Sequence, residues 1–458
     1  MRIAVIGGLA AGPAAAAEAK RHAPEAEVVM FEAGPHISVG TCEMPYWIGG
    51  DLQPGADLLV VSPQEMKSKK GVEVHLRHRV TGLDPRRGRL TVEALDFGAS
   101  REESFDRFIL ATGARARRLG VENEDAAGVF TLRDLVDMHA IERWLDTEPV
   151  RHAVIAGGGY IGLEMAEALR QRGLRVTILD PTGRVLGSTV ACEASSLMQE
   201  AVAEAGVVVR QETATGIDTD DRGRVRAVRT DRGEIVGCQL FIVSVGVESR
   251  TELAEAAGIA LGDSGIQVDD EMRTSARTVW ACGDVVEIPR APDGKRVLWP
   301  LATTARRTAR VAARNTAASL SRGRSTTDRF APFAGAVAVK AFGVEVGSVG
   351  LSMKLAEGAG IDAFATDIRH VSRTAMFEGV EPIDVRLVAE QGSGRLLGGQ
   401  VVGREGAALR ANVLVPLVQS GASVRALAED HDLIYNPPLA PAVDPLKIAA
   451  AHALRQLS

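Results

Sequence analysis

One cysteine lies in a segment whose neighbours are unlike those of a structural thiol. The segment SVGTCEMPYWIGG, residues 38–50, surrounds Cys42 with small and polar residues instead of an apolar run. Because proline is tolerated only in the first turn of a helix, Pro45 predicts a helix that begins near Thr41, capped by Thr41 or Ser38. A thiol in that turn feels the positive end of the helix dipole, which favours the thiolate. The segment alone is equally compatible with an inert, half-buried cysteine.

A glycine-rich stretch farther along the chain predicts a dinucleotide site. It reads GGGYIG and matches the G-x-G-x-x-G pattern at three positions: Gly157, Gly159 and Gly162. The stretch follows an apolar strand and opens a helix, and Asp180 ends the next strand. Glycines let the backbone approach a pyrophosphate at the helix N-terminus, and the acid accepts the ribose hydroxyls. Asp180 would repel a 2′-phosphate and favours NADH, although the nearby Arg184 keeps NADPH possible. A coincidental Gly-rich turn is the alternative.

A looser copy of this unit opens the chain. The order is a strand at residues 2–8, a helix at 12–23 and a strand at 26–33. Leu9 stands where the second glycine of the pattern is expected, and Glu32 ends the second strand. Two such βαβ units predict two nucleotide sites, each with its own parallel sheet. Later in the chain, ATGA and ACGD each follow a strand, and both recur in flavoproteins.

Length and composition narrow the protein class. A chain of 458 residues is too long for one core and suggests roughly two to four domains. The net charge of -6 argues against a nucleic-acid partner. The four cysteines lack paired spacing, so neither a disulfide framework nor a metal site is indicated: Cys42, Cys192, Cys238 and Cys282. No apolar stretch is long enough for a membrane span, and we expect a cytoplasmic protein without a membrane partner.

The remaining segments give further expectations. Residues 320–329 are polar and read as a linker, and residues 385–403 carry a hairpin signal, two apolar strands joined by a Gly/Ser turn. The end of the chain is a Pro-rich segment that runs into a helix.

Together these motifs resemble the flavin-dependent pyridine nucleotide-disulfide oxidoreductases. The matches are IGGLAAG, FEAGPHISVGTCEMPYWIGG, ATGA, GGGYIGLE, WACGDVVE and YNPPLAPAVDPL, in that order over nearly the whole chain. The resemblance implies an α/β protein with two Rossmann-like domains, for FAD and NAD, and an α+β dimerisation domain. The FAD domain would take residues 1–116 and 245–325, the NAD(P)H domain 117–244 and the dimerisation domain 326–458. The implied protein is an FAD-dependent NAD(P)H:disulfide oxidoreductase that works as a homodimer with shared active sites.

The resemblance also assigns residues to cofactors. FAD would contact the first fingerprint and three later positions: Gly7, Gly8, Ala10, Gly12, Glu32, Thr112, Gly113, Gly283 and Asp284. The nicotinamide nucleotide would contact the second fingerprint and its surroundings: Gly157, Gly159, Gly162, Glu164, Asp180 and Gly246. Glu164 matches a family glutamate near the nicotinamide, and an ordinary ion-pair partner is its alternative role.

Cys42 matches the redox cysteine of the single-cysteine branch, which holds coenzyme A-disulfide reductases, NADH oxidases and NADH peroxidases. In two-cysteine relatives such as glutathione reductase a second cysteine lies five residues later, where this chain has Trp47. Cys42 would therefore cycle through a mixed disulfide with its substrate, a persulfide or a sulfenic acid. The substrate would be a small disulfide or persulfide.

Within the branch the chain is most similar to the coenzyme A-disulfide reductases. Oxidases and peroxidases carry a histidine where this chain has Ala10, and PYWIGG also follows the reductases. Lys20 and Arg21 match a basic pair used for coenzyme A phosphates, with a solvated helix end as the alternative. Ser38 and Thr41 would also lie at the substrate.

Several departures separate the chain from that branch. Thr41 replaces asparagine and Glu43 replaces glycine, and the carboxylate of Glu43 would repel anionic substrates. Met376 and Phe377 stand in a segment where the branch has tyrosines, so Tyr435 is the expected proton donor, acting in the active site of the other subunit. An NADH oxidase or peroxidase, a polysulfide reductase, and a reductase of a protein electron carrier remain the alternative functions.

Overall fold

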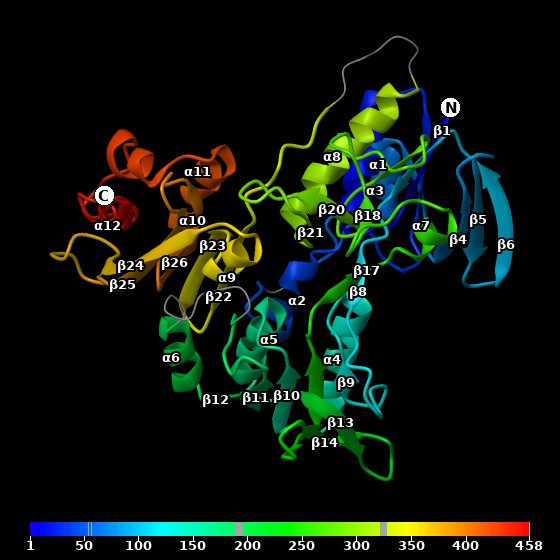
Figure 1. Ribbon diagram of the computed structural model, residues 1–458. Coiled ribbons are helices and arrows are strands. Elements are labelled where there is room, and N and C mark those ends of the chain that lie inside the picture. Colours follow the sequence, from blue (N-terminus) through cyan, green and yellow to red (C-terminus); the bar gives the residue numbers. More distant parts are fainter. Residues whose placement is uncertain (54, 56, 188–195, 321–327, 458) are drawn as a thin grey trace.

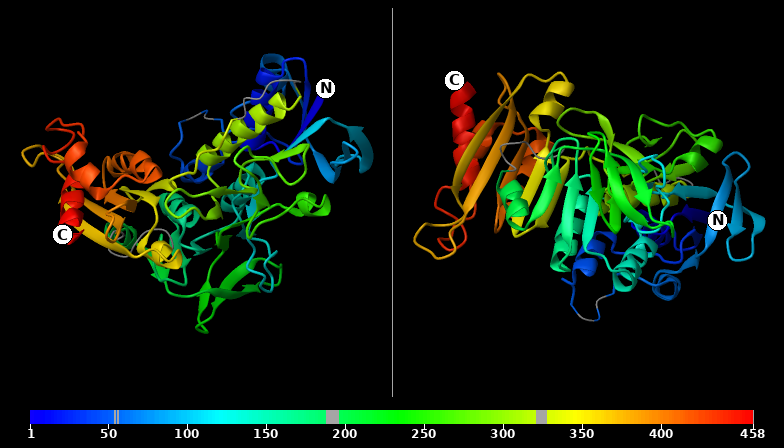
Figure 2. Two further views of the ribbon diagram at one scale, coloured as in Figure 1. Left: turned by 45° about the horizontal axis from the view of Figure 1, so that its top comes forward. Right: turned by 90° about the horizontal axis from the view of Figure 1, so that it is seen from below.

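The computed structural model describes residues 1–53, 55, 57–187, 196–320 and 328–457. Its chain forms two units with parallel sheets and a C-terminal unit with an antiparallel sheet (Figure 1). The two chain ends lie at opposite sides of the molecule in every view (Figures 1 and 2). This architecture confirms the expected fold class.

The first unit is built on a parallel sheet in the order β19-β7-β1-β2-β3. Its strands are short, and those inside the sheet are buried on both faces, as apolar runs such as RIAVI predict. They are β1 (Arg2–Ile6), β2 (Glu27–Phe31), β3 (Val72–His75), β7 (Arg107–Leu110) and β19 (Val279–Ala281). Because β19 follows the whole second unit in sequence, the chain leaves this sheet after β7 and later returns to it.

Small residues let two helices of this unit pack closely. Helix α1 (Ala11–His22) lies against α8 (Ala302–Ala318) in this first unit. Their contact is lined by alanines: Ala15, Ala16, Ala19, Ala305, Ala309, Ala312 and Ala313. The unit also holds α3 (Pro63–Lys70), α7 (Glu252–Ala256), β4 (His78–Asp84), β5 (Arg89–Ala94), β6 (Ala99–Ser104), β18 (Ile266–Gln267), β20 (Val286–Pro289) and β21 (Arg296–Leu298). Strands β8 (Ala114–Ala116) and β17 (Val247–Ser249) pair where the chain crosses between the first two units.

The second unit repeats the parallel design in the order β12-β11-β10-β16-β9. Its strands are β9 (Val129–Phe130), β10 (His152–Ala156), β11 (Arg175–Leu179), β12 (Val207–Arg210) and β16 (Leu240–Val243). Its helices are α4 (Leu135–Thr147), α5 (Tyr160–Gln171) and α6 (Ser196–Glu204). A small antiparallel sheet is added by β13 (Ala214–Thr219), β14 (Val225–Thr230) and β15 (Ile235–Gly237). Both predicted βαβ units are thus confirmed.

The C-terminal unit is an antiparallel sheet in the order β22-β23-β26-β25-β24 with helices on it. The strands are β22 (Ala336–Ala341), β23 (Val344–Gly350), β24 (Ala363–Val371), β25 (Pro382–Glu390) and β26 (Leu396–Gly403). The helices are α9 (Met353–Gly358), α10 (Ala407–Ala411), α11 (Leu414–Ser420), a π-helical turn (Ala426–Asp430) and α12 (Pro445–Leu457). Strands β25 and β26 confirm the predicted hairpin, and α12 confirms the C-terminal helix.

The segment with Cys42 forms a 3₁₀ turn, η1 (Thr41–Glu43), that runs into α2 (Met44–Gly49). Helix α2 packs against α5, and its Met44 and Ile48 belong to the apolar core of the second unit. That core extends into the C-terminal sheet through Val346 and Val402. The short α2 is therefore held by packing between units, not by its own length.

Two predictions fall largely outside the described residues. Most of the predicted linker at residues 320–329 lies outside the described residues, and Cys192 lies outside them too. In the part of the chain that the structure describes, no helix is both long and apolar enough to cross a membrane.

Candidate active site

The turn after β1 brings the backbone of the first nucleotide fold into close contact. Gly7 has a φ of +108°, and a Cβ added there would lie 2.1 Å from the carbonyl oxygen of Ala111. At Gly12 an added Cβ would lie 1.8 Å from the carbonyl oxygen of Gly7. Helix α1 starts at Ala10 with no side-chain cap and no acid in its first turn. Its first N–H groups are thus suited to a phosphate.

A buried carboxylate closes this turn on the β2 side. Glu32 accepts hydrogen bonds from the N–H groups of Gly8 (2.5 Å) and Gly34 (2.6 Å). Burial raises the pKa of Glu32, against the effect of these two donors. The bonds hold the carboxyl group at the end of β2, where an acid in this fold binds a ribose.

The second fold repeats the arrangement. A Cβ at Gly157 would lie 2.4 Å from the Ser244 carbonyl oxygen, and one at Gly162 would lie 2.0 Å from that of Gly157. Asp180 Oδ2 accepts from the Gly158 N–H at 2.9 Å, as Glu32 does from Gly8. A Cβ at Gly159 would meet nothing within 4 Å, so the protein leaves that side of the turn open. Helix α5 likewise starts without a side-chain cap.

One other predicted FAD position, Asp284, is bonded to an arginine that the sequence did not reveal. Arg133 donates to Asp284 Oδ2 at 2.8 Å and to the Ala114 carbonyl at 3.1 Å. Thr112 Oγ1 donates to the Arg250 carbonyl at 2.8 Å. Three predicted glycines have positive φ in the connecting turns: Gly113 and Gly283, expected at FAD, and Gly246, expected at the nicotinamide nucleotide. Arg133 comes directly before α4 without any motif around it, so only the fold places it here.

Both folds therefore fit the nucleotides expected from the sequence. Each offers an uncapped helix N-terminus for a pyrophosphate and an acid at the end of the second strand for a ribose. The contacts of individual residues with FAD or NADH remain predictions.

The expected cap in front of Cys42 is wrong. Helix α2 begins at Met44 with Pro45 in its first turn, but Thr41–Glu43 forms a 3₁₀ turn that starts from Gly40. Neither Thr41 nor Ser38 caps it through a side chain, and Ser38 instead adopts a φ of 51° in the approach. Backbone carbonyls satisfy the turn instead: the Thr41 N–H donates to Val39 at 3.0 Å and the Glu43 N–H to Gly40 at 3.3 Å.

The expectation that Cys42 readily forms a thiolate is also wrong for the single chain. The Cys42 side chain is exposed, yet the surrounding protein removes enough water to raise its pKa. The carboxylates of Glu43 and Glu164 raise this pKa further, whereas Thr41 and Arg133 lower it. A 3₁₀ turn of three residues has too small a dipole to overcome these effects.

Helix α2 connects Cys42 to the second nucleotide fold through two side chains. Tyr46 donates its hydroxyl to Glu164 Oε1 at 3.2 Å, and Trp47 Nε1 donates to Glu142 Oε1 at 2.9 Å. Glu164 lies on α5, one turn after Tyr160, which begins that helix. Burial raises the pKa of Glu164 to about 7. The predicted nicotinamide glutamate and the predicted redox cysteine are thus brought to one place.

The basic pair expected at the substrate is engaged elsewhere. Lys20 Nζ donates to the carbonyls of Pro24 (2.7 Å) and Ala26 (2.9 Å), and Arg21 donates to Glu18 at 2.5 Å. Both residues occupy the last turn of α1, where cations offset the helix dipole. These contacts favour the alternative of a helix end, and binding of coenzyme A phosphates remains a prediction.

Tyr435 lies in the exposed segment before α12. Among the described residues no hydrogen bond joins it to the Cys42 turn, and its side chain is exposed. The same segment meets the Met376 loop, where the Thr374 N–H donates to the Pro437 carbonyl at 3.1 Å. Exposed apolar side chains gather in these two segments: Met376, Phe377, Ile434, Tyr435 and Leu439.

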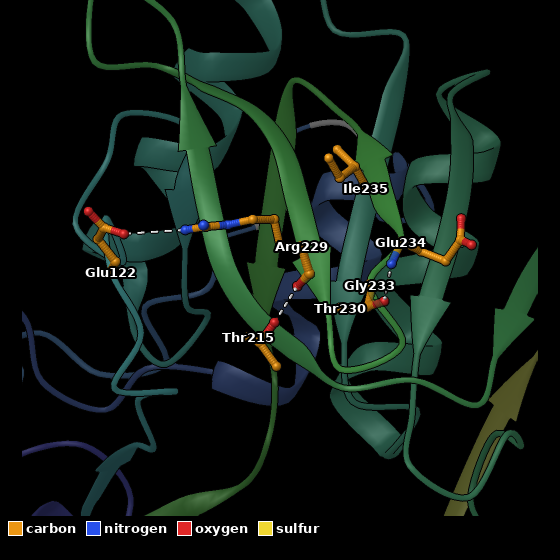
Figure 3. Close-up of a pocket in the computed structure, with 7 residues that line it drawn as sticks. All are labelled: Glu122, Thr215, Arg229, Thr230, Gly233, Glu234 and Ile235. Atoms are coloured by element: carbon orange, nitrogen blue, oxygen red, sulfur yellow. Dashed lines mark hydrogen bonds and ion pairs between the residues drawn. The ribbon is translucent and has the colours of Figure 1, made fainter.

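Two surface hollows lie away from this chemistry. One is lined by residues of β13–β15 and by Glu122, and Figure 3 shows Arg229 reaching toward Glu122 across it. Their ion pair spans 3.3 Å. The other hollow lies nearby around Asn123 and Gly223. Neither contains a thiol or a Gly-rich turn at a helix start.

Two further cysteines of the described ranges are shielded from solvent. Cys238 and Cys282 are buried, and burial raises the pKa of each to about 12. Over the described ranges, no three or more His, Cys, Asp or Glu side chains are grouped so as to hold a metal ion.

Comparison with known proteins gives relatives over the full length. An NAD(P)H sulfur oxidoreductase (CoA-dependent) of Pyrococcus abyssi is 33% identical over 455 residues, covering 98% of this chain and 97% of the relative. A coenzyme A disulfide reductase of Staphylococcus epidermidis is 26% identical over 441 residues, 95% of this chain and 96% of the relative. The solved structure of an NAD-dependent persulfide reductase from A. fulgidus matches with a TM-score of 0.93 at 30% identity, over 100% of this chain and 83% of that one.

Family sequence models match both parts of the architecture. The one described as pyridine nucleotide-disulphide oxidoreductase matches residues 1–309, and that of the family's dimerisation domain matches residues 337–446. The chain is an oxidoreductase that belongs to the pyridine nucleotide-disulphide oxidoreductase family.

Proposed function

We propose that the protein moves two electrons from NADH through FAD and Cys42 to a small disulfide or persulfide. The observation that carries this proposal is the exposed thiol of Cys42, which lies just before α2. Helix α2 packs against α5, the first helix of the second nucleotide fold. Trp47 occupies the position of a second thiol and is tied to Glu142. Among the cysteines that the structure describes, Cys238 and Cys282 are buried, and in our proposal the sulfur that pairs with Cys42 is the substrate's.

The chain's residues divide the work of binding. FAD, when bound, would supply the two-electron link between the nicotinamide and sulfur. The turns at Gly7 and Gly157 would take the two pyrophosphates, and Glu32 and Asp180 the riboses. Asp180 supports NADH over NADPH. Arg133 would neutralise Asp284 beside the flavin site.

Sulfur exchange at Cys42 proceeds in two balanced steps. The thiolate attacks a disulfide RS–SR′, a Cys42–SR bond forms, and R′S⁻ leaves and takes up a proton. Two electrons and one proton then break the Cys42–SR bond, releasing RSH and restoring the thiolate. With a persulfide, attack on the outer sulfur releases RSH, and reduction of the Cys42 persulfide releases hydrogen sulfide.

The charges at Cys42 favour a substrate less anionic than coenzyme A disulfide. The carboxylates of Glu43 and Glu164 both raise the pKa of the Cys42 thiol, and Arg133 is ion-paired with Asp284. Lys20 and Arg21, the expected phosphate ligands, already have partners within α1 and the loop after it. The sulfur and coenzyme A chemistry named for the relatives supports the reaction type, while these residues argue for a different leaving thiol.

The functional unit in this proposal is a homodimer. The match to the dimerisation domain and the exposed apolar side chains around Met376 and Ile434 support it. Tyr435 of the partner subunit would then reach Cys42 and donate a proton to the departing thiolate.

An anaerobic assay with several acceptors tests the proposal. Oxidation of NADH and NADPH is followed with coenzyme A disulfide, coenzyme A persulfide, polysulfide, an uncharged disulfide, peroxide and oxygen. We expect turnover with disulfide or persulfide that exceeds turnover with peroxide and oxygen. Preference for oxygen or peroxide would identify an oxidase or peroxidase, and turnover with none would favour a protein electron carrier as acceptor.

A further inference from the structure

Tyr46 forms a bridge between the redox thiol and the nucleotide-binding helix. Because η1 runs into α2, Cys42 and Tyr46 are four residues apart, about one turn along the same stretch of helix. The Tyr46 hydroxyl donates to Glu164 Oε1 at 3.2 Å. Glu164 thus bonds to the helix that follows Cys42, although it belongs to another unit.

Among the described residues, no cation is in contact with the Glu164 carboxylate to offset its negative charge. It faces Tyr46 from α2 and Glu167 from its own helix. Glu167 accepts from the Phe342 N–H at 2.6 Å and faces Asp51 and Lys340. Glu164 is half-buried, so burial raises its pKa to about 7, with Glu167 adding to the rise and Tyr46 opposing it.

The groups that face Cys42 give this carboxyl group influence over the thiol. Glu43 follows it in the same turn, Glu164 approaches from α5, and Arg133 approaches from the segment before α4. Arg133 is paired with Asp284 at 2.8 Å. Glu164 is therefore the neighbour whose charge changes near neutral pH.

We propose that Tyr46 is a positioning residue that holds Glu164 beside Cys42, so that the charge on Glu164 controls how readily Cys42 forms a thiolate. A charged Glu164 opposes the thiolate, and a protonated Glu164 permits it. The exchange is balanced, because the proton lost by the Cys42 thiol is matched by one taken up at the Glu164 carboxylate. The inference deepens the proposed function and rests on it for the reactivity of Cys42.

Alkylation of Cys42 in the oxidised holoenzyme tests this role directly. The rate of iodoacetamide labelling is followed by mass spectrometry of the Cys42 peptide from about pH 6 to about pH 9. Glu164→Gln removes the charge, and at about pH 8 it should raise the labelling rate about three- to tenfold. Tyr46→Phe should change the rate in the same direction but less, since loss of the donor leaves more of Glu164 protonated.

Trp47→Phe is the matched control, because it removes one donor from the same helix to Glu142 on α4. Its labelling profile should stay within about twofold of the parent, because Trp47 bonds to Glu142 and not to Glu164. A double variant, Tyr46→Phe with Glu164→Gln, should match Glu164→Gln alone, since Tyr46 acts through Glu164.

The inference is overturned if Glu164→Gln leaves the labelling profile where Trp47→Phe leaves it. It is also overturned if Tyr46→Phe still alters the profile when Glu164 is already Gln. Flavin content and the melting temperature of each variant show whether it is folded. If Tyr46→Phe does not fold, Glu164→Gln alone still tests the inference. Labelling needs no turnover, so it separates this inference from the proposed function, which fails if Cys42 is dispensable for disulfide reduction or if the acceptor assay shows no preference for disulfide or persulfide.

Discussion

Asp180 sets the nicotinamide preference in this account, and its removal gives a prediction that can be scaled from the structure. The carboxylate follows β11 and accepts three hydrogen bonds, from the Gly158 N–H (2.9 Å), the Thr182 N–H (2.9 Å) and the Thr182 hydroxyl (2.6 Å). A carboxylate has about four acceptor sites. About one acceptor site therefore remains for a ribose hydroxyl, and the three protein donors hold the Asp180 carboxylate in place.

The expected magnitude follows from that one bond. A hydrogen bond to a charged group contributes about 1.5 to 3 kcal/mol, which is roughly 10- to 150-fold in an equilibrium constant. Asp180→Ala should thus lower kcat/KM for NADH by about that factor. For NADPH the variant removes a like-charge repulsion, so kcat/KM should hold or rise. Arg184 follows Asp180 by four residues and would then be a cation close to the 2′-phosphate without the charge of Asp180 beside it.

Anaerobic stopped-flow reduction of the bound flavin by each nucleotide measures the effect without the sulfur step. Thr182→Val is the matched control: it keeps the charge of Asp180, removes one of the three donors and should shift the NADH/NADPH ratio only a few-fold. Flavin content and the melting temperature confirm folding. If Asp180→Ala leaves the NADH/NADPH ratio unchanged, or if the parent already prefers NADPH, the reasoning about Asp180 is refuted.

Three further predictions address the flavin, the substrate and the second subunit. Gently purified protein should be yellow and should release one FAD per chain, as measured by absorbance. Colourless protein that takes up no added FAD would contradict the assignment of FAD to the first nucleotide fold. Glu43→Gln should raise kcat/KM for an anionic disulfide such as dithiodiglycolate about two- to fivefold relative to uncharged bis(2-hydroxyethyl) disulfide, because it removes one exposed like charge; an unchanged ratio would exclude charge selection by Glu43. Tyr435→Phe should lower disulfide turnover about tenfold or more, the range of a lost general acid; unchanged turnover across pH in an intact dimer would leave Tyr435 with packing alone.

The nucleotide folds could be predicted from sequence because their constraints are local. Close approach of strand, turn and helix permits only glycine at Gly7 and Gly12, and the same holds at Gly157 and Gly162. The acids Glu32 and Asp180 come at fixed distances after those turns and bond to them as the pattern implies. Such positions depend on backbone sterics, which the sequence shows directly.

The environment of Cys42 depends on residues that are distant in sequence. Burial and the approach of Glu164 from α5 reverse the expected effect of the helix start on the thiol pKa. The cap failed because a 3₁₀ turn replaces the first turn of the predicted helix. Arg133 reaches Asp284, 151 residues away, and has no motif that marks it. Only the fold brings these groups together.

The central claim is that hydride transfer and sulfur exchange are separate, with Cys42 responsible for the second alone. Cys42→Ser in the holoenzyme tests it most directly, with both half-reactions followed anaerobically by stopped flow. The account predicts that NADH reduces the flavin at a rate close to that of the parent, while the reduced variant is no longer reoxidised by disulfide or persulfide. Reoxidation by disulfide at most of the parent rate would contradict the account and make Cys42 a structural residue.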